Sequence, residues 1–341
     1  MSNKKKIKVG IVGMGGIGRV HLSIYSKMKD VKLLAFSDVV RKKDIERKYR
    51  VEWYESYDSM LDNEDLDAVS LCTPPYLHFK IAKDCIGRGI SVLIEKPVCK
   101  SLEEVKKLYE LSNTHSSVIL PGYSLFFDKG VQKLFSLVQR EELGALVFAY
   151  FNMASPAPSA SWYYQKAKSG GGVIVDKGAH LFPIISKLFG TPDKIDCEVE
   201  IIPESDIEQK AEIILKYEGF NTYIMLNWLQ SKMFTRMEIH GTGGSFILDG
   251  YGTTRYISEE VYGFSLIHPH LALQLMKEFG GMIKGRFLGS KAEIYVNEIK
   301  TFINLVKGIE SEQYLLIPTM EDAVKTWELV EKIYKEVGID V

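Results

Sequence analysis

The stretch IKVGIVGMGGIG, residues 7–18, joins a mostly apolar run to a cluster of glycines. The run Ile7–Val12 is typical of a strand buried on both faces, as strands of parallel sheets are. Gly13, Gly15 and Gly18 follow with the spacing Gly-x-Gly-x-x-Gly, directly before an amphipathic segment. The first glycine permits a tight turn, the second lets the backbone approach a pyrophosphate, and the third lets the helix pack close to the strand. The stretch therefore predicts a strand–turn–helix unit that binds a dinucleotide.

An acid at the end of the next predicted strand extends this site. Asp38 follows the strand Val31–Ser37 and lies 20 residues beyond Gly18. A carboxylate there accepts hydrogen bonds from the adenosine ribose and repels a 2′-phosphate, which favours NAD over NADP. Arg41 and Lys42 follow closely and would soften that preference. The cofactor-binding residues predicted from this region are Gly13, Gly15, Gly16, Ile17, Gly18 and Asp38.

Outward from the glycines, residues 1–123 alternate short apolar runs with segments of helical period. Further strands are predicted at 68–73, Ser91–Glu95 and 118–123. Ser101 and Glu104 form a capping-box pattern that opens a helix between the last two of these strands. Because strand–helix–strand crossovers are right-handed, the economical topology is a doubly wound parallel sheet. Residues 1–123 are therefore predicted to form a Rossmann domain.

The character of the chain changes in residues 124–341. One amphipathic helix is predicted around residues 131–138, and period-two strands then dominate. Strands are predicted at 145–152, Lys194–Ile201, 211–217, 222–229, 234–240 and 245–248. Short turns at Glu218-Gly219 and Gly243-Gly244 make these strands antiparallel. The second domain is thus predicted to be α+β with a large, mainly antiparallel open sheet. It ends in helices at 296–308 and 320–337, the last of which would pack back on the first domain.

Composition restricts the possible partners. The chain has 341 residues, with 43 Lys and Arg against 44 Asp and Glu, so no global field attracts nucleic acid or an anionic membrane. No apolar stretch approaches the roughly 20 residues of a membrane span, and the N-terminus lacks a signal-peptide pattern, so a cytoplasmic protein is expected. The thiols Cys72, Cys85, Cys99 and Cys197 are scattered without metal-ligand spacing. His268 and His270 flank a proline without a third ligand, which favours a loop, and no metal site is predicted.

Several motifs occur together and in order: the glycine-rich loop, Thr73-Pro74-Pro75 with His78, Glu95-Lys96-Pro97, Gly170-Gly171-Gly172 with Asp176 and His180, and residues 239–244. In these motifs, and in the closing helix from Glu321, nearly the whole chain resembles the glucose–fructose oxidoreductase / inositol dehydrogenase (Gfo/Idh/MocA) family. The resemblance implies a Rossmann domain followed by a domain whose open sheet often forms the subunit interface. A homodimer or homotetramer through that sheet is therefore expected.

The resemblance implies catalytic roles for Lys96, Asp176 and His180, and the residues themselves support them. Lys96 ends a parallel strand, at the edge where open α/β sheets place ligands. Asp176 and His180 are four residues apart, on one face of a predicted helix. His180 would act as general base, and Lys96 would stabilise a developing alkoxide. Asp176 would orient the imidazole or bond a neighbouring hydroxyl. A cis peptide before Pro97 is a further hypothesis from the family.

Other residues are assigned around this centre. Thr73, Pro74, Glu95 and Lys96 are expected on the cofactor side, and His78 is open between a cofactor contact and an ordinary helix-start residue. Aromatic residues expected to line the substrate pocket are Tyr123, Trp162, Tyr163 and Tyr164.

Two positions depart from the family pattern. Pro183 stands where an acid is common, and residues 124–127 read Ser-Leu-Phe-Phe where a polar residue is frequent. Both changes remove polar groups from regions that would face a polyol, which leaves a more apolar or smaller substrate open.

The leading hypothesis is an NAD-dependent oxidoreductase that transfers a hydride between nicotinamide and a hydroxyl or keto group of a sugar, polyol or related small molecule. Two alternatives remain open. One is a glycoside hydrolase that oxidises its substrate transiently with bound NAD. The other is a non-catalytic sensor that binds the dinucleotide and a partner protein.

Overall fold

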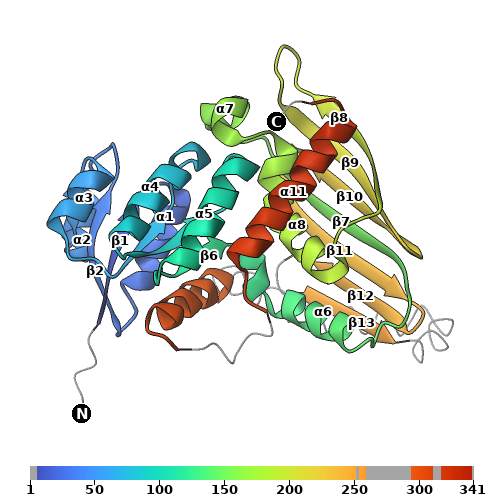
Figure 1. The fold of residues 1–341 in the computed structure, drawn as a ribbon, viewed down its shortest axis with the longest axis horizontal. Coiled ribbons are helices and arrows are strands. Elements are labelled where there is room, and N and C mark those ends of the chain that lie inside the picture. The colour runs from blue at the N-terminus through green and yellow to red at the C-terminus, as the bar shows by residue number, and fades with distance from the viewer. Residues whose placement is uncertain (1–5, 251–252, 259–292, 310–315, 340–341) are drawn as a thin grey trace.

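The computed structural model describes residues 6–250, 253–258, 293–309 and 316–339. These residues form two β-sheets that lie side by side with helices between them (Figure 1). The pair His268 and His270 lies outside the described residues.

Sheet A has six strands in the order β3-β2-β1-β4-β5-β6, and all its pairings are parallel. Its strands are β1 (Ile7–Val12), β2 (Val31–Ser37), β3 (Glu52–Tyr54), β4 (Ala68–Leu71), β5 (Ser91–Glu95) and β6 (Ile119–Gly122). The predicted doubly wound parallel sheet is confirmed. Only β3 was not predicted, because three residues are too few to show a hydrophobic period. The strand order reverses between β1 and β4, and ligands of such sheets bind at the carboxyl edge beside this switch point.

The helical segments of this half are α1 (Gly16–Tyr25), α2 (Lys43–Tyr49), α3 (Tyr57–Asn63), η1 (Pro75–Leu77), α4 (His78–Gly87) and α5 (Leu102–Thr114). The capping box predicted for α5 is half formed. Ser101 Oγ accepts the N–H of Glu104 at 3.3 Å, but the Glu104 carboxylate accepts the N–H of Lys100 instead of returning to Ser101.

Sheet B has seven strands in the order β13-β12-β11-β7-β10-β9-β8. They are β7 (Leu146–Pro156), β8 (Lys194–Ile201), β9 (Glu208–Tyr217), β10 (Phe220–Asn227), β11 (Leu229–Gly241), β12 (Gly244–Asp249) and β13 (Thr253–Ser258). Its pairings are antiparallel except for β7 with β10. β7 lies between β10 and β11, which run in opposite directions, so it is parallel to one and antiparallel to the other. The predicted, mainly antiparallel sheet is confirmed, and the unpredicted β13 adds an edge strand.

The helical segments of the second half are η2 (Ser124–Phe127), α6 (Lys129–Gln139), η3 (Ser161–Tyr164), α7 (Lys166–Ser169), α8 (Val173–Phe189), a helix at residues 293–306, and α11 (Met320–Glu336). Helix α8 packs on β7, β9 and β10 of sheet B, and α11 packs on both α8 and α5. In Figure 1, α11 crosses diagonally between α5 and sheet B. Helix α11 thus lies between the two sheets and contacts both halves.

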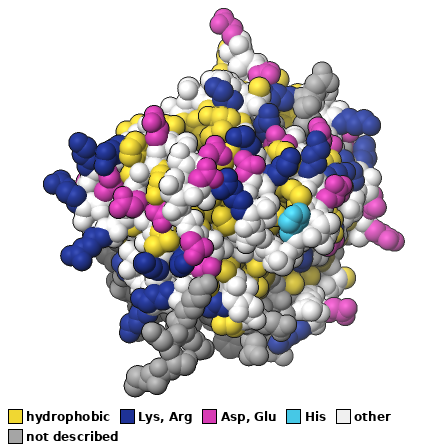
Figure 2. Space-filling view, turned by 60° about the vertical axis from the view of Figure 1, so that its left-hand side comes forward, with side chains coloured by type: hydrophobic (Ala, Val, Ile, Leu, Met, Phe, Trp, Pro, Cys, Tyr) yellow, Lys and Arg dark blue, Asp and Glu magenta, His cyan; other side chains and the backbone are white. Residues whose placement is uncertain are grey.

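The surface matches the balanced composition. Basic and acidic side chains are interspersed over the face that Figure 2 shows. Within the part of the chain that the structure describes, each helix is too short or too polar to cross a bilayer. The thiols of Cys72, Cys85, Cys99 and Cys197 are free.

Candidate active site

The glycine-rich loop joins β1 to α1 at the carboxyl edge of sheet A. Gly13 has a φ of 92°, and a Cβ on it would lie 2.6 Å from the carbonyl oxygen of Cys72. A Cβ on Gly18 would lie 2.0 Å from the carbonyl oxygen of Gly13, so only glycine lets α1 begin this close to β1. A Cβ on Gly15 or Gly16 would meet nothing within 4 Å. Internal packing explains Gly13 and Gly18, and the open side at Gly15 and Gly16 fits the approach of a pyrophosphate.

The N-terminus of α1 suits an anion. Gly15 caps the helix without a side-chain hydrogen bond, and the first turn contains no acid, so the N–H groups of this turn, that of Ile17 included, have no competing carboxylate nearby in sequence. Asp38 follows β2 and ties the loop to it. Its Oδ2 accepts the N–H of Met14 at 2.7 Å, and its Oδ1 accepts the N–H of Val40 at 2.8 Å. Each carboxylate oxygen keeps a lone pair for a ribose hydroxyl.

Arg41, which would soften the preference for NAD, is engaged elsewhere. Its guanidinium donates to both oxygens of Glu46 at 3.0 and 2.9 Å and lies 5.1 Å from the centre of the Trp53 ring. These contacts hold Arg41 on α2 and β3. The geometry therefore agrees with a site for NAD rather than NADP.

His78 connects the loop after β4 to the loop after β5. Its ring is fully buried, with Nε2 2.7 Å from the carbonyl oxygen of Thr73 and Nδ1 3.0 Å from that of Pro97. Burial lowers the pKa of His78 although the carbonyl oxygens oppose it. With no exposed surface, His78 supports the site from behind and does not line it. The Lys96–Pro97 peptide is cis, as hypothesised.

Thr73 and Pro74, directly before η1, are both half-buried. The Thr73 hydroxyl is buried and makes no hydrogen bond to any described residue. A buried hydroxyl without a partner at the carboxyl edge of β4 fits a contact with the cofactor, because buried polar groups are normally satisfied.

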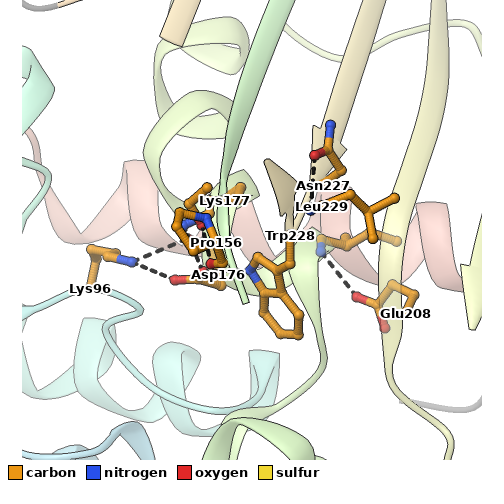
Figure 3. A network of polar contacts seen from close by, with 10 residues as sticks. Lys96, Pro156, Asp176, Lys177, Glu208, Asn227, Trp228 and Leu229 are labelled. Atoms are coloured by element: carbon orange, nitrogen blue, oxygen red, sulfur yellow. Dashed lines mark hydrogen bonds and ion pairs between the residues drawn. The ribbon is translucent and has the colours of Figure 1, made fainter. Parts of the chain in front are cut away.

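Lys96 and Asp176 are 80 residues apart in sequence and meet in the structure. Lys96 Nζ lies 2.8 Å from Asp176 Oδ1 and 3.2 Å from the Asp176 carbonyl oxygen (Figure 3). Their side chains are 16% and 8% exposed. Lys96 follows β5 of sheet A and Asp176 lies in the first turn of α8, so this ion pair joins the two halves of the chain.

Two further donors hold the Asp176 carboxylate. Its Oδ2 accepts a hydrogen bond from Trp228 Nε1 at 3.0 Å and lies 3.0 Å from Lys177 Nζ (Figure 3). Burial alone would raise the pKa of Asp176, but Lys96, Lys177 and His180 hold it well below its usual value. Burial alone would lower the pKa of Lys96, yet Asp176 and Tyr163 raise it above its usual value. Both partners are therefore charged at neutral pH, and Lys96 offers a fixed positive charge and N–H groups for hydrogen bonds rather than acting as a base.

His180 lies one turn beyond Asp176 on α8 and is half-buried. Tyr163 of η3 approaches the same ion pair, its ring edge-on to Trp228 at 6.1 Å and stacked on Trp162 at 3.8 Å. Burial raises the pKa of Tyr163, while Lys96 opposes the shift, so the phenol stays protonated. Charged, aromatic and imidazole groups from different elements thus gather at the carboxyl edge of β5.

Glu208 and Tyr334 explain two of the three glycines before α8. This fully buried carboxylate accepts the N–H groups of Gly172 at 2.9 Å and Ile174 at 3.0 Å, and the hydroxyl of Tyr334 at 2.8 Å. A Cβ on Gly172 would lie 2.2 Å from the carbonyl oxygen of Glu208, and one on Gly171 1.9 Å from the Tyr334 hydroxyl. Glu208 therefore caps the helix that carries Asp176 and His180.

Some predicted pocket residues belong to the core instead. Tyr123 is 2% exposed, and its hydroxyl bonds Thr326 of α11. Leu125, Phe126 and Phe127 are also buried, so the apolar segment 124–127 carries no information about the substrate. It is apolar because it packs beneath α6 and α8. Tyr164 is half-buried, and its hydroxyl donates to the carbonyl oxygen of Pro158.

Sequence reasoning missed Trp228, Lys177 and Glu208. Trp228 lies inside the predicted strand 222–229 and reads as one more apolar residue, and nothing local marks its indole N–H as a donor. Glu208 reads as an exposed acid in a charged stretch. Lys177, directly after Asp176, carried the one available signal, a lysine within a mainly apolar helix.

Two family models match the chain. The oxidoreductase family with an NAD-binding Rossmann fold matches residues 7–123, and the GFO/IDH/MocA C-terminal domain matches residues 131–247. A myo-inositol 2-dehydrogenase of Thermotoga maritima is 22% identical over 315 residues, 89% of each chain. The uncharacterized oxidoreductase YrbE of Bacillus subtilis is 27% identical over 190 residues, so the chain spans only 55% of that relative's length.

Among solved structures, GenD2 from gentamicin A biosynthesis in complex with NAD superimposes with a TM-score of 0.79 at 19% identity, covering 98% of this chain and 95% of that one. At this identity the likeness shows the fold. The two family matches go further, because together they take in more than half of the chain. The chain therefore belongs to the Gfo/Idh/MocA family of oxidoreductases, with an NAD-binding Rossmann fold at residues 7–123.

Proposed function

We propose that this protein is an NAD-dependent dehydrogenase or reductase that acts on a hydroxyl or keto group of a sugar, polyol or related small molecule. The observation that carries the proposal is the buried Lys96–Asp176 ion pair at the carboxyl edge of β5. Burying two charges costs free energy that their attraction rarely exceeds, so such a pair is weak evidence of a purely structural role. Its position at the carboxyl edge of sheet A, the edge that also carries the glycine-rich loop, supports a catalytic one. The similarity to a myo-inositol 2-dehydrogenase supports the substrate class.

In the proposed mechanism, bound NAD supplies the hydride acceptor or donor. The Lys96 ammonium, kept charged by Asp176, stabilises negative charge that develops on the substrate oxygen. His180 takes the proton of the substrate hydroxyl in the oxidation direction and returns it in the reduction direction. Asp176 aims Lys96, and is itself held by Trp228 and Lys177.

The remaining site residues take binding roles. Thr73, Pro74, Glu95 and Lys96 are proposed on the cofactor side, together with the glycine-rich loop and Asp38. The Tyr163 phenol and the Trp162 ring are proposed as the wall of the substrate pocket, since an aromatic face and a hydroxyl donor together suit a sugar ring. Tyr123 is left out because its side chain is buried. Free thiols and an NAD site suit a cytoplasmic enzyme, and we propose that location.

The test is a panel of sugars, polyols and keto-sugars followed by NADH absorbance, with NAD and NADP in parallel. We expect turnover with NAD for at least one member of the panel. Turnover with NADP alone would contradict the role of Asp38. Product analysis of the same reactions separates the alternatives: glycoside cleavage without net NADH formation indicates a hydrolase, and NADH binding without chemistry on any member indicates a sensor.

A further inference from the structure

A buried polar cluster lies behind the proposed catalytic edge, and the mechanism above does not use it. It consists of His21 in α1, Glu95 at the end of β5, and Glu298 in the helix at 293–306. One nitrogen or oxygen atom from each side chain lies within 4.8 Å of the other two. His21 and Glu298 are 0% exposed and Glu95 is 9% exposed. The cluster joins the dinucleotide-binding helix, the strand that leads to Lys96, and a helix from the C-terminal part of the chain.

Two members of the cluster are paired with each other. His21 Nε2 lies 3.2 Å from Glu95 Oε1, which is ion-pair distance without the geometry of a hydrogen bond, and His21 Nδ1 lies 3.1 Å from Ser70 Oγ. The second oxygen of Glu95 accepts the backbone N–H of Lys96 at 3.2 Å. The Glu95 carboxylate therefore has a neighbour on each oxygen, and one of them is the backbone of the proposed catalytic lysine.

Glu298 lies near both His21 and Glu95 but is held by neither an ion pair nor a backbone N–H of the described residues. Neither of its oxygens has a hydrogen-bond partner among the described residues. The titratable and polar groups that face the cluster are His21 and Tyr25 from α1, Ser70 from β4, Cys72 directly after β4, Glu95 from β5, and Tyr295 from the same helix as Glu298. In this set only His21 can carry a positive charge, and it faces Glu95, while Lys96 faces Asp176.

Two buried carboxyl groups at this separation cannot both ionise without a cation between them, because the low dielectric strengthens their repulsion. We propose that Glu298 is a positioning residue that keeps its proton at neutral pH and, as an uncharged acid, joins the C-terminal helix at 293–306 to the Glu95–His21 pair. Burial, and then Glu95, raise the pKa of Glu298 well above its usual value. The proposal rests on the proposed function only for its effect on turnover. The protonation state of Glu298 and the affinity for NADH are both measured without substrate.

The test of the proton compares urea unfolding of the wild type and Glu298→Gln as a function of pH. An acid with a raised folded pKa holds a proton that the unfolded chain releases above about pH 4.3, so stability falls as pH rises toward the folded pKa. Glutamine has no proton to lose. Between about pH 5 and pH 7 the folding equilibrium constant of the wild type should fall about tenfold per pH unit relative to Glu298→Gln. Glu293→Gln, which changes a 49%-exposed side chain on the same helix, should keep the wild-type slope.

The test of positioning is NADH binding at pH 7, followed by fluorescence. Glu298→Gln should bind NADH as the wild type does, because it keeps the shape of the neutral acid. Glu298→Ala should bind on the order of fivefold more weakly, because it removes the contact behind α1 and Glu95. Normal NADH binding in Glu298→Gln would indicate that the neutral acid suffices. Weak binding in both variants would indicate that the negative charge is required.

Several results would overturn the proposal. Equal pH slopes in the wild type and Glu298→Gln would mean that Glu298 is ionised. A glutamine variant as damaged as the alanine variant would mean that the charge is needed. One equivalent of a transition metal in the purified protein, lost in Glu298→Gln, would make the cluster a metal site, since imidazole and carboxylates ligate such ions.

If Glu298→Gln does not fold, Glu298→Met, which also lacks a titrating proton, should show the same shallow slope, and a wild-type slope in it would count against the proposal. Retained turnover in a Lys96 variant would defeat the proposed function and leave these measurements standing.

Discussion

Lys96 and Asp176 each hold the other in its charged form, although both are largely removed from water. Lysine remains protonated here because the carboxylate opposes the effect of burial. A group that stays protonated through the working pH range contributes a fixed positive charge, which suits the stabilisation of a developing oxyanion.

Replacing that charge should slow turnover. We predict that Lys96→Met lowers kcat/KM by about 10²- to 10³-fold, the usual loss when one oxyanion-stabilising donor is removed. NADH absorbance with the best substrate of the panel measures this. Lys100→Met is the matched control, because the Lys100 amine donates to the carbonyl oxygen of Ala167 at an exposed position, away from Asp176. A Lys96→Met enzyme with full turnover would defeat the catalytic assignment.

Asp176 links stability to pH. Its pKa is depressed in the folded protein, so its contribution is present above the unfolded pKa of about 3.9 and is lost as pH falls toward the folded pKa. Asp176→Asn should lower the free energy of unfolding at pH 7 by about 3–5 kcal/mol, because Lys96 and Lys177 lose a buried counter-charge. The deficit relative to the wild type should shrink at pH 3. Urea unfolding at the two pH values measures it, and an equal deficit at both would contradict the assignment.

At the scale of elements, helix α1 shows what a local pattern leaves out. The apolar spacing predicts a stripe through Ile17, Val20, His21, Ile24 and Met28. The buried residues of α1 are Gly18, His21, Leu22 and Tyr25, so His21 alone was correctly placed. The helix is rotated because its N-terminal end packs tightly on β1 at the third glycine of the loop, and that contact sets which face turns inward.

The loop glycines offer a matched pair of variants. Gly18→Ala places a Cβ 2.0 Å from the carbonyl oxygen of Gly13, a contact that only backbone movement can relieve. We expect it to lower the melting temperature clearly. Gly15→Ala meets no protein atom within 4 Å, so it should fold normally and yet bind NADH about tenfold or more weakly. Thermal unfolding and NADH fluorescence on both variants check this, and normal NADH affinity in Gly15→Ala would contradict the proposed pyrophosphate contact.

The N-terminal cap of helix α8 depends on Glu208, which lies on the distant strand β9. Glu208→Ala would leave two helix N–H groups and the Tyr334 hydroxyl without their acceptor, so we predict a loss of about 3 kcal/mol or more in the free energy of unfolding. Glu212→Ala, at an exposed position of the same strand, should change stability little. Urea unfolding compares the two. Equal, small effects would show that α8 does not need its side-chain cap.

At the scale of the whole molecule, the described residues leave one face of sheet B exposed. Its other face is covered by α8, and in Figure 1 the helices of the described residues lie on that covered side. Phe148 and Tyr223, near the middle of the sheet, are 37% and 40% exposed, which is unusual for large aromatic side chains on adjacent strands. A second copy of the chain would cover them, as the family resemblance implies.

We therefore predict a homodimer or homotetramer formed through this face. Tyr223→Asp should shift the protein toward monomer, because a carboxylate would be buried at the interface without a partner. Val39→Asp, at an 85%-exposed position after β2, should leave the assembly unchanged. Light scattering after size-exclusion chromatography measures the mass. A wild-type monomer at micromolar concentration would contradict the prediction.

The sequence by itself determined the features that local physics controls. Glycine spacing, apolar runs and short turns depend on neighbours within a few residues, so the loop after β1, the parallel strands, the hairpins of sheet B, and the placement of Lys96 at a strand end were all predictable. The four-residue spacing of Asp176 and His180 was equally visible, because it repeats with the helical turn.

Only the tertiary structure decided how those pieces meet. It brings Lys96 into contact with Asp176, 80 residues away in sequence, and places the Trp228 indole N–H on the same carboxylate. It places Glu208 at the N-terminus of α8, where it caps the helix. It also turns Tyr123 into the core, and brings Glu298 behind the catalytic edge. These contacts arise from the packing of separate sheets and helices. No residue's immediate neighbours specify which distant side chain it will face.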